Sequence, residues 1–308
     1  MRGPRLSPKF LVVLSVGALF SFSCSHQGPS GKTLGVTLLT KEHVFYRDLE
    51  QGLRDTARQK GFNLVVTSGD WDLAKQQGQI ENFIVQRVAA IIVCPVNSKG
   101  IGPAIDKANQ AGIPVFTADI KANEGRVVSH IASDNYQGGK LAGEYLAKAL
   151  NGKGKVAVID QPIVESAIER VRGFEDVLHG SPGIKIVAKP SGDGVRDKAM
   201  KAAEDLLQGY PDLNGIFGIN DDSALGALSA IESSGRQGIV VLGFDAIPEA
   251  RAAILRGSAL KADVVQSPAQ IGEKTIETID RYLRGETVPP LIPVEVKVVD
   301  KAILEKEK

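Results

Sequence analysis

The sequence is poor in cysteine and in aromatic residues, and it has no surplus of charge of either sign. Among its 308 residues are two cysteines, Cys24 and Cys94, and aromatic side chains make up 5% of the chain. Lys and Arg number 37 and Asp and Glu 36, so the chain lacks the basic field that nucleic-acid binding requires. Cys24 falls in a leader segment and Cys94 ends an apolar strand, so we expect no disulfide.

The short motifs of common enzyme classes are also missing. There is no G-x-S-x-G elbow, Walker loop, H-E-x-x-H zinc motif or G-x-G-x-x-G turn. The sequence shows no cluster of metal ligands, and the four histidines are scattered: His26, His43, His130 and His179. We therefore expect a protein that is not an enzyme and that holds neither a metal nor a cofactor.

The N-terminus carries the longest apolar run. Arg2, Arg5 and Lys9 precede the apolar stretch 10–22, which is typical of a secretory signal and too short to span a bilayer comfortably. Without residues 1–23 the chain has 34 basic and 36 acidic residues. Residues 21–24 resemble the lipobox of bacterial lipoproteins, which predicts acylation of Cys24, an extracytoplasmic location and a Gly/Ser/Pro-rich tether over 24–32. The alternative is an ordinary signal peptide cut nearby.

From residue 33 onward, short apolar runs alternate with amphipathic stretches. This alternation predicts parallel sheets covered by helices on both faces. Because some five units precede residue 135 and five follow it, we expect two doubly wound α/β lobes. The predicted strands are Thr33–Leu39, Phe62–Thr67, Val88–Val93, Ile113–Thr117, Val127–Ile131, Lys155–Ile159, Ile184–Ala188, Asn214–Gly218, Gly238–Gly243, Lys261–Val265 and Val294–Val299.

Polar residues follow two neighbouring strands in the second half. Asn220-Asp221 comes after the strand 214–218, and Asp245 after the strand 238–243, with a helix from Ala224 between them. Ligands of open parallel sheets bind at the carboxyl ends of the strands, so this edge is a candidate site. The alternative for Asn220 and Asp245 is helix capping, and we expect Asp221 to be a cap or solvated residue.

Four segments, in this order, resemble the periplasmic sugar-binding proteins of the ribose/galactose type: Val127–Asn135 (VVSHIASDN), Asn220–Leu228 (NDDSALGAL), Val241–Asp245 (VLGFD) and Gln266–Gly272 (QSPAQIG). These are the sugar-capture subunits of ABC importers, and the resemblance covers residues 33–299. It implies the periplasmic binding protein-like type I fold, with three hinge crossings between lobes. Placed on this chain, the lobes comprise residues 33–133 plus 267–295 and 134–266 plus 296–308.

The resemblance also implies ligand-binding positions. Aromatic side chains of the family stack on the sugar, and polar side chains bond its hydroxyl groups; the matching residues are Phe45, Tyr46, Asp119, Ser133, Arg170, Asn220, Asp245 and Gln266. His43 stands where the family has an amide, and we expect it to face the ligand too. Other departures are Leu39 for a hydroxyl, Ile120 for an arginine, and no aromatic residue near 194. These departures leave the identity of the sugar open.

Chemistry supports these residue types. Carboxylates and a guanidinium form charge-assisted hydrogen bonds with hydroxyls, and aromatic faces pack on C–H groups. The alternatives are a turn for Asp119, a solvent-facing Arg170, a first core turn for Phe45 or Tyr46, a backbone bond for Gln266 and an exposed loop for His43. We interpret His130 and Trp71 as packing residues.

We therefore expect a monomeric substrate-binding protein that captures a monosaccharide or polyol and delivers it to an ABC permease. A secreted carbohydrate-active enzyme is a rival, because two acids near a sugar suggest a glycosidase. A DNA-binding repressor shares the core but needs a helix-turn-helix before residue 33. A third possibility is a sensor that presents sugar to a chemoreceptor or sensor kinase.

Overall fold

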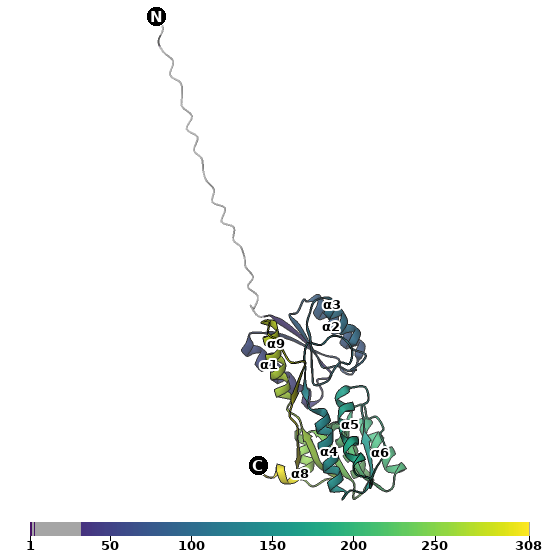
Figure 1. Ribbon diagram of the computed structural model, residues 1–308. Coiled ribbons are helices and arrows are strands. Elements are labelled where there is room, and N and C mark those ends of the chain that lie inside the picture. The colour runs from purple at the N-terminus through teal and green to yellow at the C-terminus, as the bar shows by residue number, and fades with distance from the viewer. Residues whose placement is uncertain (2, 4–31, 308) are drawn as a thin grey trace. The chain divides into compact units, whose positions relative to one another are not determined.

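The computed structural model describes residues 1, 3 and 32–307, so the predicted signal peptide, tether and Cys24 lie outside the described residues. The chain forms two lobes, each built on one six-stranded sheet (Figure 1). The first lobe contains strands β1 (Thr33–Leu38), β2 (Asn63–Ser68), β3 (Ala90–Val93), β4 (Val115–Ala118), β5 (His130–Ser133) and β11 (Leu291–Val294), with helices α1 (Val44–Lys60), α2 (Leu73–Val85), α3 (Gly102–Gln110) and α9 (Pro268–Leu283).

The second lobe repeats this plan. It contains strands β6 (Gly154–Ile159), β7 (Ile184–Ala188), β8 (Leu213–Gly218), β9 (Val240–Asp245), β10 (Leu260–Val265) and β12 (Lys297–Asp300), with helices α4 (Asn135–Ala149), α5 (Glu165–His179), α6 (Arg196–Gly209), α7 (Asp221–Ser234), α8 (Pro248–Leu255) and α10 (Lys301–Leu304). The strand orders are β11-β5-β4-β3-β1-β2 and β12-β10-β9-β8-β6-β7. Their described strands pair in parallel, except for β12, which is antiparallel to β10. The predicted fold class is confirmed.

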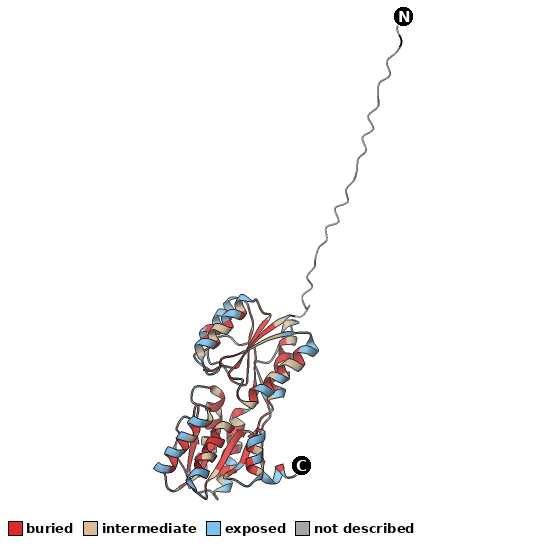
Figure 2. Cartoon of the chain, turned by 180° about the vertical axis from the view of Figure 1, so that it is seen from behind, coloured by how far each residue is buried: buried red, intermediate tan, exposed pale blue. Residues whose placement is uncertain are grey.

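Apolar burial on both faces of each sheet explains this layering. The central strands are buried, the outer strands β2, β7, β11 and β12 are only partly so, and the helices turn their exposed side outward (Figure 2). In the first lobe α1 and α9 pack together on one face, and α2 and α3 on the other. In the second lobe α4 packs closely on α5, because Gly139 has no side chain: a Cβ there would lie 1.9 Å from the carbonyl oxygen of Arg170. This close approach fixes the backbone that carries Arg170.

The chain crosses between the sheets three times. The crossings follow β5 at Ser133, follow β10 at Val265, and join β11 to β12 through residues 295–296. The single final strand predicted over Val294–Val299 was therefore wrong, because Val294 ends β11 in the first sheet whereas residues 297–299 belong to β12 in the second. Within residues 32–307 no helix is long and apolar enough to cross a membrane.

Besides the three crossings, direct hydrogen bonds join the two lobes. Ser98 in the first lobe donates its backbone N–H to the carbonyl oxygen of Ile163 (3.1 Å) and accepts the N–H of Glu165 on its hydroxyl (2.9 Å). Asn123 Nδ2 donates to Glu165 Oε2 at 2.9 Å. These residues follow β3, β4 and β6, so the carboxyl ends of strands in the two sheets lie near one another.

Candidate ligand-binding site

A cavity lies among these strand ends, with about 470 Å³ of empty space when the open solvent at its mouth is included. Both lobes line it. Its lining includes eight of the nine residues predicted to bind ligand: His43, Phe45, Tyr46, Asp119, Arg170, Asn220, Asp245 and Gln266. Ser133 is not part of the lining; its hydroxyl is buried without a hydrogen-bond partner, and its ligand contact stays a prediction.

Asp119 and the aromatic pair form the first-lobe side of the cavity. The Tyr46 hydroxyl donates to Asp119 Oδ2 at 2.7 Å, and the Phe45 ring meets the Tyr46 ring edge-on with centroids 5.2 Å apart. Burial raises the pKa of Asp119 to about 6, opposed by the Arg170 guanidinium and by the Tyr46 hydrogen bond. The cost of burying this carboxylate is thus only partly offset within the protein.

Arg170 reaches the cavity from α5 and is buried, contrary to the alternative of a solvent-facing side chain. Its Nε donates to Asn135 Oδ1 and one terminal nitrogen donates to the Ile219 carbonyl oxygen, each at 2.8 Å. The guanidinium carbon lies 3.8 Å from the centroid of the Phe244 ring. These contacts fix the guanidinium plane and leave its other terminal N–H groups for the cavity.

Asn220 caps a helix and also lines the cavity, whereas Asp245 lines the cavity and caps no helix, so the capping alternative for Asp245 was wrong. Asn220 caps α7 by accepting the Ser223 N–H at 2.9 Å, while Asp245 Oδ1 accepts a hydrogen bond from Gln266 Nε2 at 2.6 Å. Gln266 Oε1 is buried and has no partner. Burial raises the pKa of Asp245, and His43 and Arg170 oppose that rise. Gln266 thus bonds a side chain of the site rather than only backbone.

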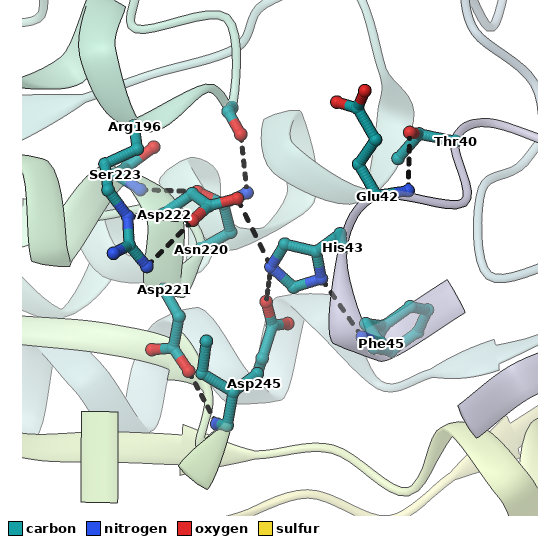
Figure 3. A network of polar contacts seen from close by, with 12 residues as sticks. Thr40, Glu42, His43, Phe45, Arg196, Asn220, Asp221, Asp222, Ser223 and Asp245 are labelled. Carbon is teal, nitrogen blue, oxygen red and sulfur yellow. Dashed lines mark hydrogen bonds and ion pairs between the residues drawn. The ribbon is translucent and has the colours of Figure 1, made fainter. Parts of the chain in front are cut away.

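His43 bridges the lobes (Figure 3). Its Nδ1 accepts the N–H of Phe45 at 3.1 Å and caps α1, so the neutral ring carries its proton on Nε2. Nε2 lies 3.5 Å from an oxygen of Asp245 and 3.7 Å from an oxygen of Asp222, both in the second lobe. Asp222 is further held by Arg196 at 3.2 Å. His43 therefore belongs to the cavity rather than to an exposed loop.

A buried pair of carboxyl groups, Asp221 and Asp263, binds the backbone that follows Asp245. Asp221 Oδ2 accepts the N–H of Ile247 at 2.7 Å, and Asp263 Oδ1 accepts the N–H of Ala246 at 3.0 Å. The remaining oxygens, Asp221 Oδ1 and Asp263 Oδ2, are buried without a hydrogen-bond partner, and each lies 2.5 Å from where a Cβ at Gly243 would be. Ionising both of these neighbouring carboxyl groups is unfavourable, because like charges repel and burial disfavours the charged form. The expectation of Asp221 as a cap or solvated residue was wrong, because it is fully buried.

This pair holds a strained turn. Asp245 and Ala246 have φ angles of 122° and 57°, which residues with a side chain rarely adopt. Burial raises the pKa of Asp263 to about 7 and that of Asp221 well above its ordinary value. The strained turn aims Asp245 at the cavity, and the pair keeps it there.

Sequence reasoning missed other lining residues, chief among them Gln161, Ser166, Thr40 and Trp71. Gln161 follows β6 at the carboxyl edge, so the rule that selected Asn220 also applied to it. The interpretation of Trp71 as a packing residue was wrong, because it is 37% exposed and lines the cavity. His130 does pack in the sheet, where it contacts the Thr117 hydroxyl at 2.9 Å.

The lining suits a neutral, hydroxyl-rich ligand. Asp119 and Asp245 supply acceptors, Arg170 and His43 supply donors, and aromatic rings supply apolar faces. Residues 32–307 hold no group of three or more potential metal-ligating side chains. The arrangement can bind and orient a polyhydroxylated molecule between two lobes.

Comparison with known proteins agrees with this chemistry. The periplasmic binding protein domain family matches residues 34–287. The ribose import binding protein of Escherichia coli (strain K12) is 35% identical over 298 residues, covering 96% of this chain and 100% of that protein. The D-apiose import binding protein of Paraburkholderia graminis is 30% identical over 282 residues, covering 91% and 90%. A periplasmic solute binding protein of an ABC transporter from Actinobacillus succinogenes, solved with bound D-allose, has a TM-score of 0.82 at 30% identity, covering 89% and 99%.

Proposed function

This chain belongs to the periplasmic binding protein domain family, and from that premise we propose that it captures a monosaccharide or polyol between its lobes for an ABC importer. Its relatives are binding proteins rather than enzymes, which disfavours the glycosidase alternative. We propose residues 33–133 plus 267–295 and 134–266 plus 296–308 as the two moving units. Ligand that contacts both units would shift the population toward the closed state.

One observation carries the proposal: a single cavity gathers acids, a fixed guanidinium and aromatic rings from both lobes. Asp119 and Arg170 come from different lobes, yet both line this cavity and both are buried. Polar atoms without protein partners, such as Gln266 Oε1, remain around it. Buried polar groups in proteins are nearly always bonded, so a ligand with several hydroxyls completes the site.

The test is a thermal-shift screen followed by calorimetry. The panel contains D-ribose, D-apiose, D-allose and xylitol, together with glucuronate as an anionic control, since bound ligand raises stability by mass action. We expect at least one neutral member to bind, and Asp119→Ala and Asp245→Ala to abolish binding while remaining folded. Asp205→Ala, at an exposed carboxylate, is the matched control. Unchanged affinity in both cavity variants would refute the site.

We also propose that the mature protein is extracytoplasmic and anchored through an acylated Cys24. The family supports the location, and the lipobox-like residues 21–24 support the anchor. Labelling of an expressing bacterium with a fatty-acid analogue should mark the wild-type protein and spare Cys24→Ser. Equal labelling of the two would refute the anchor.

The partner we propose is the membrane permease of the importer, which would recognise the closed lobes. Its import-protein relatives support this role. Deletion of the gene should abolish uptake of the bound sugar. Intact uptake combined with a lost chemotactic or signalling response would favour a chemoreceptor or sensor kinase instead.

A further inference from the structure

Gln161 and Trp71 line the cavity, one from each lobe, and neither belongs to the binding set inferred above. We propose that both contact the ligand and that they select a ring-shaped sugar or cyclitol over an open-chain polyol. This inference rests on the proposed function, because it assumes that the cavity binds a polyhydroxylated molecule.

Gln161 offers a hydrogen-bond donor that the protein does not use. Its side chain is 5% exposed, and its Nε2 has no hydrogen-bond partner. An amide buried in this way is unfavourable unless an acceptor reaches it. A ligand hydroxyl or ring oxygen in the cavity is such an acceptor.

The neighbouring amide, Asn220, is by contrast occupied within the protein. Its Oδ1 caps α7, and its Nδ2 donates to the carbonyl oxygen of Gly194 at 3.1 Å. Gly194 in turn packs on Gln161: a Cβ at position 194 would lie 2.6 Å from Gln161 Oε1, and φ there is 68°. Packing fixes the Gln161 side chain, so its amide nitrogen is the donor that remains for a ligand.

Trp71 offers a ring that is not packed away. It is 37% exposed, and its backbone is left-handed (φ 65°), next to Asp70 at φ 50°. Its N–H donates to the Leu39 carbonyl oxygen at 3.4 Å, which holds this unusual conformation beside the cavity. Left-handed backbone is unfavourable for tryptophan and persists where the surroundings impose it, commonly at functional sites.

The chemistry of these two groups favours a ring. A cyclic sugar presents a rigid C–H face to an indole and holds its hydroxyls at fixed angles toward an amide. An open-chain polyol must freeze several C–C torsions to do the same, which weakens its binding. The selection therefore follows from the ligand's preorganisation rather than from its number of hydroxyls.

The experiment compares matched pairs by calorimetry on the mature chain: D-ribose with ribitol, D-xylose with xylitol, and D-allose with allitol. In the pair that binds best, we expect the ring to bind at least about tenfold more tightly than the open chain. Gln161→Leu should weaken binding of that cyclic sugar about tenfold. It should not lower the unfolding temperature of the free protein, since Nε2 has no protein partner. Trp71→Ala should reduce the ring preference, and Trp71→Phe should keep most of it.

Gln208→Leu, at an exposed glutamine of α6, controls for loss of an amide and should leave affinity unchanged. Equal or tighter binding of the open chain, or wild-type affinity in both Gln161→Leu and Trp71→Ala, overturns this inference and leaves the proposed function standing. Failure of the wild-type chain to bind any of the six compounds, or any member of the first panel, overturns the proposed function and this inference with it.

Discussion

Asp119→Asn should stabilise the unliganded protein while it destroys ligand binding. The pKa of Asp119 rises from 3.8 to about 6 on folding, mainly because the carboxyl group is buried. One pKa unit corresponds to about 1.4 kcal/mol, so ionised Asp119 costs up to about 3 kcal/mol of folding free energy at pH 8. Asparagine keeps an acceptor for the Tyr46 hydroxyl, 2.7 Å away in the wild-type protein, and carries no charge.

The pH dependence of the stability difference between Asp119→Asn and wild type follows from this raised pKa. An acid whose pKa is raised by folding stabilises the folded state below its unfolded pKa, and that stability is lost as the pH rises through the folded value. The advantage of Asp119→Asn should therefore be largest above about pH 6 and shrink toward pH 3.8. Urea unfolding at pH 8 and pH 4 measures it, with Asp205→Asn as an exposed control. A variant no more stable than wild type at pH 8 would refute the reasoning.

Three further predictions concern the same groups. Sugar affinity should fall between pH 7.5 and pH 5 as Asp119 takes up a proton, and calorimetry of the wild-type protein and of the exposed-site variant Asp205→Asn should show the same fall; a pH-independent wild-type affinity contradicts this. Asp263→Asn should remove the loss of wild-type stability expected as the pH rises through about 7, because an asparagine has no proton to lose there; urea unfolding at pH 6 and pH 9 decides, and parallel curves for the two proteins count against the pair. His43→Asn should weaken sugar binding yet keep the α1 cap, whereas His43→Ala should also lose about 1 kcal/mol of stability; equal unfolding temperatures would show that the cap is unimportant.

The fold could be predicted from the sequence because apolar runs and amphipathic stretches alternate regularly along the chain. The exception lies at the C-terminus. Residues 294–299 read as one alternating run, and nothing in the pattern marks where pairing passes from β5 to β10. A strand's partner is a tertiary property, so periodicity alone could not divide Val294 from Lys297.

The site was accessible where polar residues end buried strands, as at Asp119 and Asp245. Trp71 was not, because its exposure depends on a left-handed backbone that the sequence does not announce. Asp263 gave a signal that went unused: it is an acid within the apolar strand β10, where burial demands a partner. Its partner, Asp221, lies at the start of α7, and only the sheet order brings the two together.

Gln266 lies where the chain passes from β10 to α9, and its amide holds Asp245. The hinge between the lobes and the ligand-binding site therefore share Gln266. Because three separate segments span the gap, twisting of one half against the other should be resisted and bending favoured. One distance, measured between a spectroscopic label on α2 and another on α6, should then follow the whole opening and closing motion of the lobes.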